Sequence, residues 1–131
     1  MTLEMMTKII SADSSVMVSY FQGKKDKNSQ LIDYAMSSSS LVLPPLVISE
    51  LLSDWKLSSH SIQNIAAIPT LQIKHGYWQR AGLIRAKLIS QKFKARIADV
   101  LIAQSCIDHN VPLIALDKDF RHFKKFGLRV L

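Results

Sequence analysis

Cysteine, glycine and long apolar runs are scarce in this 131-residue sequence, and each scarcity excludes a class of protein. The single cysteine, Cys106, excludes an internal disulfide and a zinc site built from several cysteines. The glycines do not form a GxGxxG or GxxxxGK phosphate-binding loop. No apolar run approaches the roughly 20 residues of a membrane-spanning helix, and the segment MTLEMMTKIISADSS lacks the pattern of a signal peptide. We therefore expect a cytoplasmic protein with no membrane partner.

Acidic residues are missing from one long interval, so the charge is unevenly distributed. The formal net charge is +7, yet no aspartate or glutamate lies between Asp54 and Asp99. This interval carries eight basic residues, whereas the rest of the chain has nine basic and ten acidic ones. A polyanionic partner fits such a segment, because phosphate contacts supply most of the sequence-independent affinity for nucleic acids. A solvated basic surface is the alternative, and charge alone does not decide between them.

Short apolar runs alternate with helix-like segments along the chain. Strands are expected over residues 8–12, 41–43, 68–73, 112–116 and 128–131. Helices are expected over residues 14–21, 29–36, 45–55, 58–65, 75–93 and 97–109, with a last helical turn over 117–123. Such alternation is typical of a three-layer α/β/α sandwich on a mainly parallel sheet. With no internal repeat or linker, residues 1–131 are expected to form one domain.

Four acidic residues are predicted to lie at the same edge of this sheet. Asp13 and Asp117 each follow directly on a predicted strand. Glu50 lies on the helix after another strand, and Asp99 lies in the first turn of the helix over 97–109. Because ligands of open α/β sheets bind outside the carboxyl ends of the strands, we expect the four carboxylates to gather there. Ionised carboxylates repel one another unless cations offset the charge, and oxygen ligands alone favour Mg²⁺ or Mn²⁺.

The chemistry that fits acids of this kind beside a basic segment is phosphodiester hydrolysis. A carboxylate-held metal ion activates a water molecule and stabilises the charge that develops on the phosphate. The basic segment would then hold the nucleic-acid backbone. The candidate RNA-binding residues are Arg80, Arg85, Lys87, Lys92, Lys94 and Arg96.

Each of the four acids also has a purely structural interpretation, which the sequence leaves open. An aspartate at the start of a helix caps it or interacts with its macrodipole, and a glutamate on a helix is often solvated. Two residues are expected to support the site: Ser14, whose hydroxyl can bond a ligated carboxylate or cap a helix, and Asp119. Trp55 and Trp78 are predicted to be core or interface anchors. The acids expected to be surface charges are Asp26, Asp33, Asp54 and Asp108.

Four motifs in series, ADSSVMVSYFQG, LPPLVISELL, RIADVLIAQSCIDHNVPLIALDKDF and FGLRVL, resemble the PIN domain. Within that family they resemble the VapC-type toxins of prokaryotic type II toxin–antitoxin pairs, over residues 8–131. The resemblance implies an α/β/α fold and an Mg²⁺- or Mn²⁺-dependent endoribonuclease. It assigns the catalytic and metal-binding roles to Asp13, Glu50, Asp99 and Asp117, and Ser14 matches a position where the family has Thr or Ser.

One position departs from this pattern. The family often has Thr or Ser two residues before the last aspartate, where this chain has Ala115, so a hydroxyl group that supports the metal site is missing. The resemblance further implies a homodimer and a small cognate antitoxin that inserts into the acidic groove, often with an arginine. The alternative to the nuclease is a non-catalytic PIN-like module that binds RNA or protein.

Overall fold

The computed structural model describes residues 8–131, in which two short strands form a parallel sheet. β1 (Ser11–Ala12) pairs with β2 (Leu113–Ile114), with Ser11 opposite Leu113 and Ala12 opposite Ile114. Three parallel bridges extend this sheet on both sides: Ile10 with Leu41, Leu43 with Thr70, and Leu113 with Val130. The five strand-like runs therefore lie in a parallel arrangement, as the sequence predicted. The regular sheet is nevertheless much shorter than the predicted sandwich, since three of the runs take part only through bridges.

Proline limits the length of these runs. Pro44 follows directly on Leu43, and Pro69 directly precedes Thr70. A proline has no backbone N–H group and cannot donate a hydrogen bond to a neighbouring strand. The carbonyl of Pro69 still accepts a hydrogen bond from Leu43 N at 2.9 Å. Pairing between these two runs is therefore confined to the single bridge of Leu43 with Thr70.

All the predicted helices are present, most of them with shifted ends. They are α2 (Ser14–Phe21), α3 (Lys27–Ser37), α4 (Pro45–Leu52), α5 (Ser59–Ala66), α6 (Tyr77–Ser90), α7 (Ile97–His109) and the 3₁₀ helix η1 (Lys118–Phe126). Helix α7 has the predicted bounds. Helix α4 ends three residues early because Ser53 caps it, its hydroxyl donating to the carbonyl of Ser49 at 2.7 Å. Helix η1 continues three residues beyond the predicted turn.

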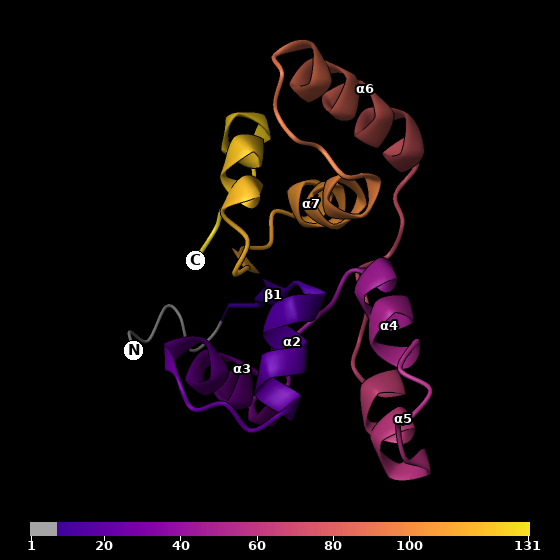
Figure 1. Cartoon of the computed structure of the whole chain (residues 1–131), viewed down its shortest axis with the longest axis vertical. Coiled ribbons are helices and arrows are strands. Elements are labelled where there is room, and N and C mark those ends of the chain that lie inside the picture. Colours follow the sequence, from indigo (N-terminus) through magenta and orange to yellow (C-terminus); the bar gives the residue numbers. More distant parts are fainter. Residues whose placement is uncertain (1–7) are drawn as a thin grey trace.

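The helices lie on both sides of the sheet (Figure 1). Helices α2 and α3 lie below β1 in this view, α6, α7 and η1 lie above it, and α4 and α5 extend at one side. Helix α7 is central and buries six of its 13 residues, which fits its nearly continuous apolar sequence. Its buried residues are Val100, Ile102, Ala103, Gln104, Ser105 and Cys106. No helix within residues 8–131 is long and apolar enough to cross a membrane. The prediction that MTLEMMTKIISADSS is not a signal peptide concerns residues 1–15, and residues 1–7 lie outside the part of the chain that the structure describes.

The prediction that the two tryptophans are core anchors is wrong. Trp55 is 86% exposed, because α4 ends before it and leaves it in the following loop, with Lys56 Nζ 5.5 Å from its ring centroid. Trp78 is 62% exposed on α6 and contacts the ring of Tyr77 edge-on. An interface role for either ring stays a prediction.

Candidate metal centre

Asp13 is buried where β1 passes into α2. It is only 5% exposed, and its Oδ1 accepts a hydrogen bond from Val16 N at 3.1 Å. The Ser15 hydroxyl donates to the same carboxylate at 3.1 Å. Asp13 is therefore the N-cap of α2, the structural role that the sequence left open for it and also for Ser14. The capping interpretation is confirmed, and the second carboxylate oxygen, Oδ2, accepts only from the Ser15 hydroxyl at 3.1 Å.

Burial raises the pKa of the Asp13 carboxyl from its ordinary value of 3.8 to about 6. The hydrogen bonds from Val16 and Ser15 oppose this rise, and the negative charges of Asp99 and Asp117 add to it. A capping role alone would lower the pKa, because the capping bond favours the charged form. The carboxylate of Asp13 thus lies in a negative and poorly solvated environment.

Asp99 is half-buried in the first turn of α7. Burial raises its pKa, and the charges of Asp117, Glu50 and Asp119 raise it further. The guanidinium of Arg96 lowers it. The carboxylates predicted to share one edge of the sheet therefore interact electrostatically, although they come from four separate parts of the chain.

Glu50 and Asp117 lie on the exposed side of this group. The Ser14 hydroxyl donates to Glu50 Oε1 at 2.6 Å, which links the start of α2 to α4. Asp117 is the N-cap of η1, as predicted, and its Oδ1 accepts from Asp119 N at 2.8 Å. Both acids thus have a structural partner and a solvent-facing carboxylate.

The donor set fits a hard divalent cation, but the carboxylates are spread apart. Among residues 8–131, no three His, Cys, Asp or Glu side chains are already arranged to hold a metal ion. The candidate ligands are carboxylates only; burial is the main cause that raises the pKa of Asp13 and Asp99, and their mutual repulsion adds to it. A divalent cation bound between them would relieve that repulsion. The residues therefore fit Mg²⁺ or Mn²⁺ provided that the side chains draw together around it.

Two of the predicted RNA-binding residues make contacts within the protein. Arg80 forms a two-pronged ion pair with Asp108, with Nη2 at 2.6 Å and Nε at 3.1 Å from the carboxylate oxygens. Arg85 Nε donates to the carbonyl of Ala95 at 2.9 Å. Contact between RNA and either arginine stays a prediction. The exposed cations among the predicted residues are Lys87, Lys92, Lys94 and Arg96.

The prediction that Asp108 is a surface charge is wrong. Its side chain is 7% exposed and is bonded by Arg80 and by Gln104 Nε2 at 2.8 Å. Burial tends to raise the pKa of Asp108, but these hydrogen bonds outweigh it and lower the pKa. The partners lie four and 28 residues away. The spacing of Gln104 was the one local signal available, because residues four apart share a helix face.

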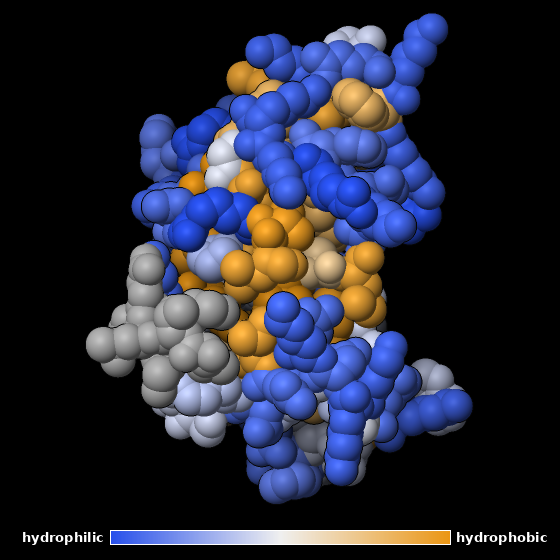
Figure 2. Space-filling model, turned by 90° about the vertical axis from the view of Figure 1, so that its left-hand side faces the viewer, coloured by the Kyte–Doolittle hydropathy of each residue, from blue (hydrophilic) through white to orange (hydrophobic). Residues whose placement is uncertain are grey.

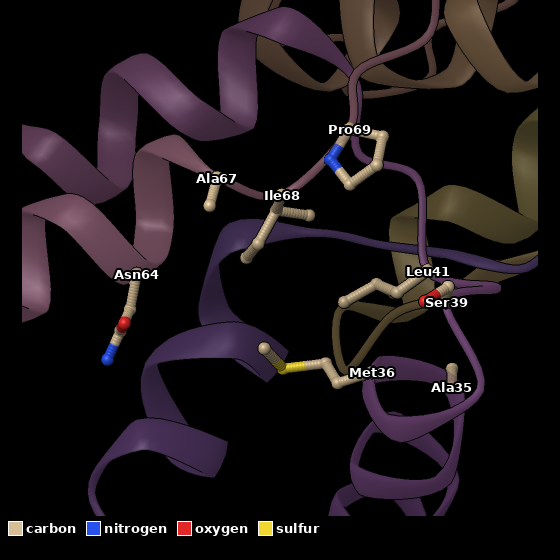
Figure 3. Close-up of a pocket in the computed structure, with 8 residues that line it drawn as sticks. All are labelled: Ala35, Met36, Ser39, Leu41, Asn64, Ala67, Ile68 and Pro69. Atoms are coloured by element: carbon tan, nitrogen blue, oxygen red, sulfur yellow. The ribbon is translucent and has the colours of Figure 1, made fainter.

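Two hollows flank helix α5. One, of about 250 Å³, lies between the ends of α3 and α5, where the side chains of Met36, Leu41 and Ile68 surround the same space (Figure 3). It has no ionisable lining residue, so it is not part of the carboxylate group. The other, of about 340 Å³, lies between α2, α4 and α5 and includes Glu50 and Asp54 in its lining. The second hollow therefore adjoins the candidate metal centre.

The fold and this group of acids define a class of protein, which comparison with known families identifies. A family model for the PIN domain matches residues 10–126. The chain belongs to the PIN-domain family. No curated protein gave a significant match.

Solved structures share this fold at low sequence identity. VapBC2 from Rickettsia felis, bound to a DNA fragment from its promoter, has a TM-score of 0.72 and 18% identity, covering 94% of this chain and 97% of that one. VapBC-5 from Mycobacterium tuberculosis, of the VapBC family of toxin–antitoxin systems, has a TM-score of 0.70 and 16% identity, with the same coverages. FitAcB from Neisseria gonorrhoeae has a TM-score of 0.67 and 15% identity, covering 94% and 96%. The likeness establishes a PIN-like fold.

Proposed function

We propose that this chain is a metal-dependent endoribonuclease, with Asp13, Glu50, Asp99 and Asp117 as its catalytic and metal-binding residues. The observation that carries the proposal is the electrostatic coupling of these acids within a chain of the PIN-domain family. Asp13 is buried and Asp99 is half-buried, and ionised carboxylates that repel one another in such places are costly unless a cation lies between them. Helix capping explains the positions of Asp13 and Asp117. It does not explain why the four acids interact electrostatically with one another.

The residues of the chain would hold and orient the parts of the reaction. Bound Mg²⁺ or Mn²⁺ would supply an activated water nucleophile and offset charge on the phosphate. Ser15 and the Val16 amide fix the Asp13 carboxylate, and Ser14 orients Glu50. Asp119 donates its amide to Asp117 and adds negative charge near Asp99. Ala115 contributes no hydroxyl group, so we expect weaker metal binding than with Thr or Ser.

We further propose that the chain is the toxin of a type II toxin–antitoxin pair and that its partner is a small antitoxin. Several structural neighbours are VapBC complexes, one of them described as a toxin–antitoxin system. The hollow beside Glu50 and Asp54 supports this proposal. Its apolar lining includes Val18 and Phe21, both more than 40% exposed. A basic amphipathic segment with an arginine matches apolar and acidic walls of this kind.

A homodimer is also proposed. Helix α6 exposes apolar side chains, with Leu83 71% exposed and Ile89 50% exposed. Hollows between these residues, Ala86 and Ile97 lie along the same helix. Exposed apolar surface of this kind is typical of protein–protein interfaces.

The proposed activity is tested by cleavage of single-stranded RNA with Mg²⁺ or Mn²⁺, compared with EDTA. We expect metal-dependent cleavage by the unaltered chain and none by Asp13→Asn or Asp99→Asn. Cleavage that survives both substitutions, or that continues in EDTA, would contradict the proposal.

A non-catalytic PIN-like module that binds RNA or protein is the second candidate. Two observations favour it: Ala115 in place of a hydroxyl residue, and the spread carboxylates among residues 8–131. Intact RNA together with measurable RNA binding would favour this candidate over the nuclease.

A further inference from the structure

The connection between α6 and α7 is fastened to helix η1 by an aromatic stack. The rings of Phe93 and His122 have centroids 4.3 Å apart and an interplanar angle of 30°. Lys125 Nζ lies 4.9 Å from the Phe93 ring centroid and donates a hydrogen bond to the side-chain carbonyl of Gln91. His122 and Lys125 of η1 therefore pack on the ring of Phe93, and Lys125 also bonds Gln91. The α6–α7 connection and η1 thus form one surface.

The other side of the connection is fixed to α6. Arg85 donates to the carbonyl of Ala95, which is buried. Lys92 has a φ of +63°, a conformation that non-glycine residues rarely adopt. Contacts on both sides hold the connection in this shape, so its exposed side chains keep a defined position relative to η1.

The joined segments expose many cations. We define the connection–η1 surface by six exposed residues: Lys92, Lys94, Arg96, Arg121, Lys124 and Lys125. The ion pairs described between residues 8 and 131 join Lys24 to Asp26 and Arg80 to Asp108, so none of the six takes part in them. In Figure 2 the upper part of the molecule, where Figure 1 has α6 and η1, is mainly hydrophilic.

Helix stabilisation explains only part of this charge. Lys124 and Lys125 lie in the last turn of η1, where cations interact favourably with the helix dipole. Arg121 lies in the middle of η1, and the other three cations belong to a different segment. Arg96 interacts with Asp99, but the other five cations take part in neither of the described ion pairs, and like charges brought together repel one another. A polyanionic ligand would therefore stabilise the arrangement.

Both segments lead to the candidate metal centre. Arg96 caps α7 three residues before Asp99 and makes no side-chain capping bond. Helix η1 begins directly after Asp117. A chain of phosphates on the connection–η1 surface would therefore run toward the acids that are proposed to act on one of them.

We propose that the connection–η1 surface binds the phosphate backbone of single-stranded RNA beside the carboxylates. This proposal rests on the proposed function and adds Arg121, Lys124 and Lys125 to the basic residues of the central interval. Phe93 is a positioning residue, because its ring joins the two halves of the surface. Cations interleaved with an aromatic ring are typical of surfaces that bind single strands.

The test measures RNA binding without cleavage. The full chain in EDTA is titrated against a fluorescein-labelled single-stranded RNA by anisotropy over a series of KCl concentrations. The double variant Arg121→Gln/Lys124→Gln removes two cations of the surface. The matched control, Lys25→Gln/Lys27→Gln, removes two exposed cations at the start of α3.

We expect the dependence of log K on log[KCl] to lose about 1.4 in slope in the surface variant, since each phosphate contact on a single strand contributes about 0.7. The control variant should keep the slope of the unaltered chain. Equal slopes for the surface variant and the control would overturn the proposal. A parallel titration uses labelled polyglutamate in place of RNA. Weaker polyglutamate binding by the surface variant, with an RNA slope equal to that of the unaltered chain, would also overturn the proposal, in favour of an acidic protein partner.

The stack is tested with the charges kept. Phe93→Ala is expected to weaken RNA binding by a few fold at constant KCl, whereas Phe93→Tyr retains the ring and should bind like the unaltered chain. Equal binding by all three would overturn the positioning role. Because binding is measured in EDTA, failure here is distinct from failure of metal-dependent cleavage, which is assayed separately.

Discussion

Replacing Asp13 by asparagine is expected to stabilise the metal-free protein at neutral pH while it removes a candidate metal ligand. Burial raises the pKa of the Asp13 carboxyl from 3.8 to about 6, and the charges of Asp99 and Asp117 contribute. The folded state therefore binds more protons than the unfolded state between these two values. Stability falls as the pH rises through this window, and the loss persists above it.

The difference between the two pKa values corresponds to about 3 kcal/mol of unfolding free energy at pH 7, as an upper bound. Asparagine caps a helix about as well as aspartate, so the bond from Val16 is retained. Asp26 provides the matched control, since it caps α3 by accepting from Ser29 N at 2.8 Å. That bond lowers the pKa of Asp26. Asp26→Asn is thus expected to lower stability, the opposite direction.

The assay is urea-induced unfolding in EDTA at about pH 7 and about pH 4. Asp13→Asn should exceed the unaltered chain in unfolding free energy at the higher pH, and the difference should shrink at the lower pH. Asp26→Asn should be less stable than the unaltered chain at the higher pH. A loss of stability in Asp13→Asn as large as that in Asp26→Asn would refute the reasoning from burial and repulsion.

Three further substitutions test other parts of the account. Arg80→Ala should cost about 2 kcal/mol in urea unfolding at pH 7, and this cost should disappear as the pH falls through the lowered pKa of Asp108; a constant cost would contradict the ion pair. Leu88→Ala, at a fully buried position of α6, should cost about 2–5 kcal/mol, which thermal melting checks. Ser14→Ala should weaken Mn²⁺ affinity by about tenfold because Glu50 loses an orienting hydroxyl; unchanged affinity in calorimetry would argue against that role.

The helices could be predicted from the sequence more fully than the sheet. The nearly continuous apolar pattern of residues 97–109 predicted the bounds of α7, since a helix that is apolar on all sides is typical of a buried position. Strand pairing depends on partners far along the chain, and the prolines beside Leu43 and Thr70 limited it more than the apolar pattern indicated. The exposed Trp55 was missed because its position depends on where α4 ends.

The acids were found because connectivity alone predicts which residues follow the strands. Their coupling could not be read from the sequence, because it depends on burial and on distances between separate segments. The same limit applies to Arg80 and Asp108, which charge patterning assigned to RNA and to the solvent. The basic residues of η1 were overlooked because only the fold brings them beside the connection that contains Phe93.

The central claim is that acids from separate parts of the chain hold one divalent ion, and Mn²⁺ binding followed by electron paramagnetic resonance tests it most directly. We predict that the unaltered chain binds Mn²⁺, that Asp99→Asn weakens binding by at least about tenfold, and that Asp33→Asn does not change it. Asp33 lies on α3, where it accepts a hydrogen bond from Tyr20, and its substitution removes the same charge. No binding by the unaltered chain, or equal binding by the two variants, would contradict the account.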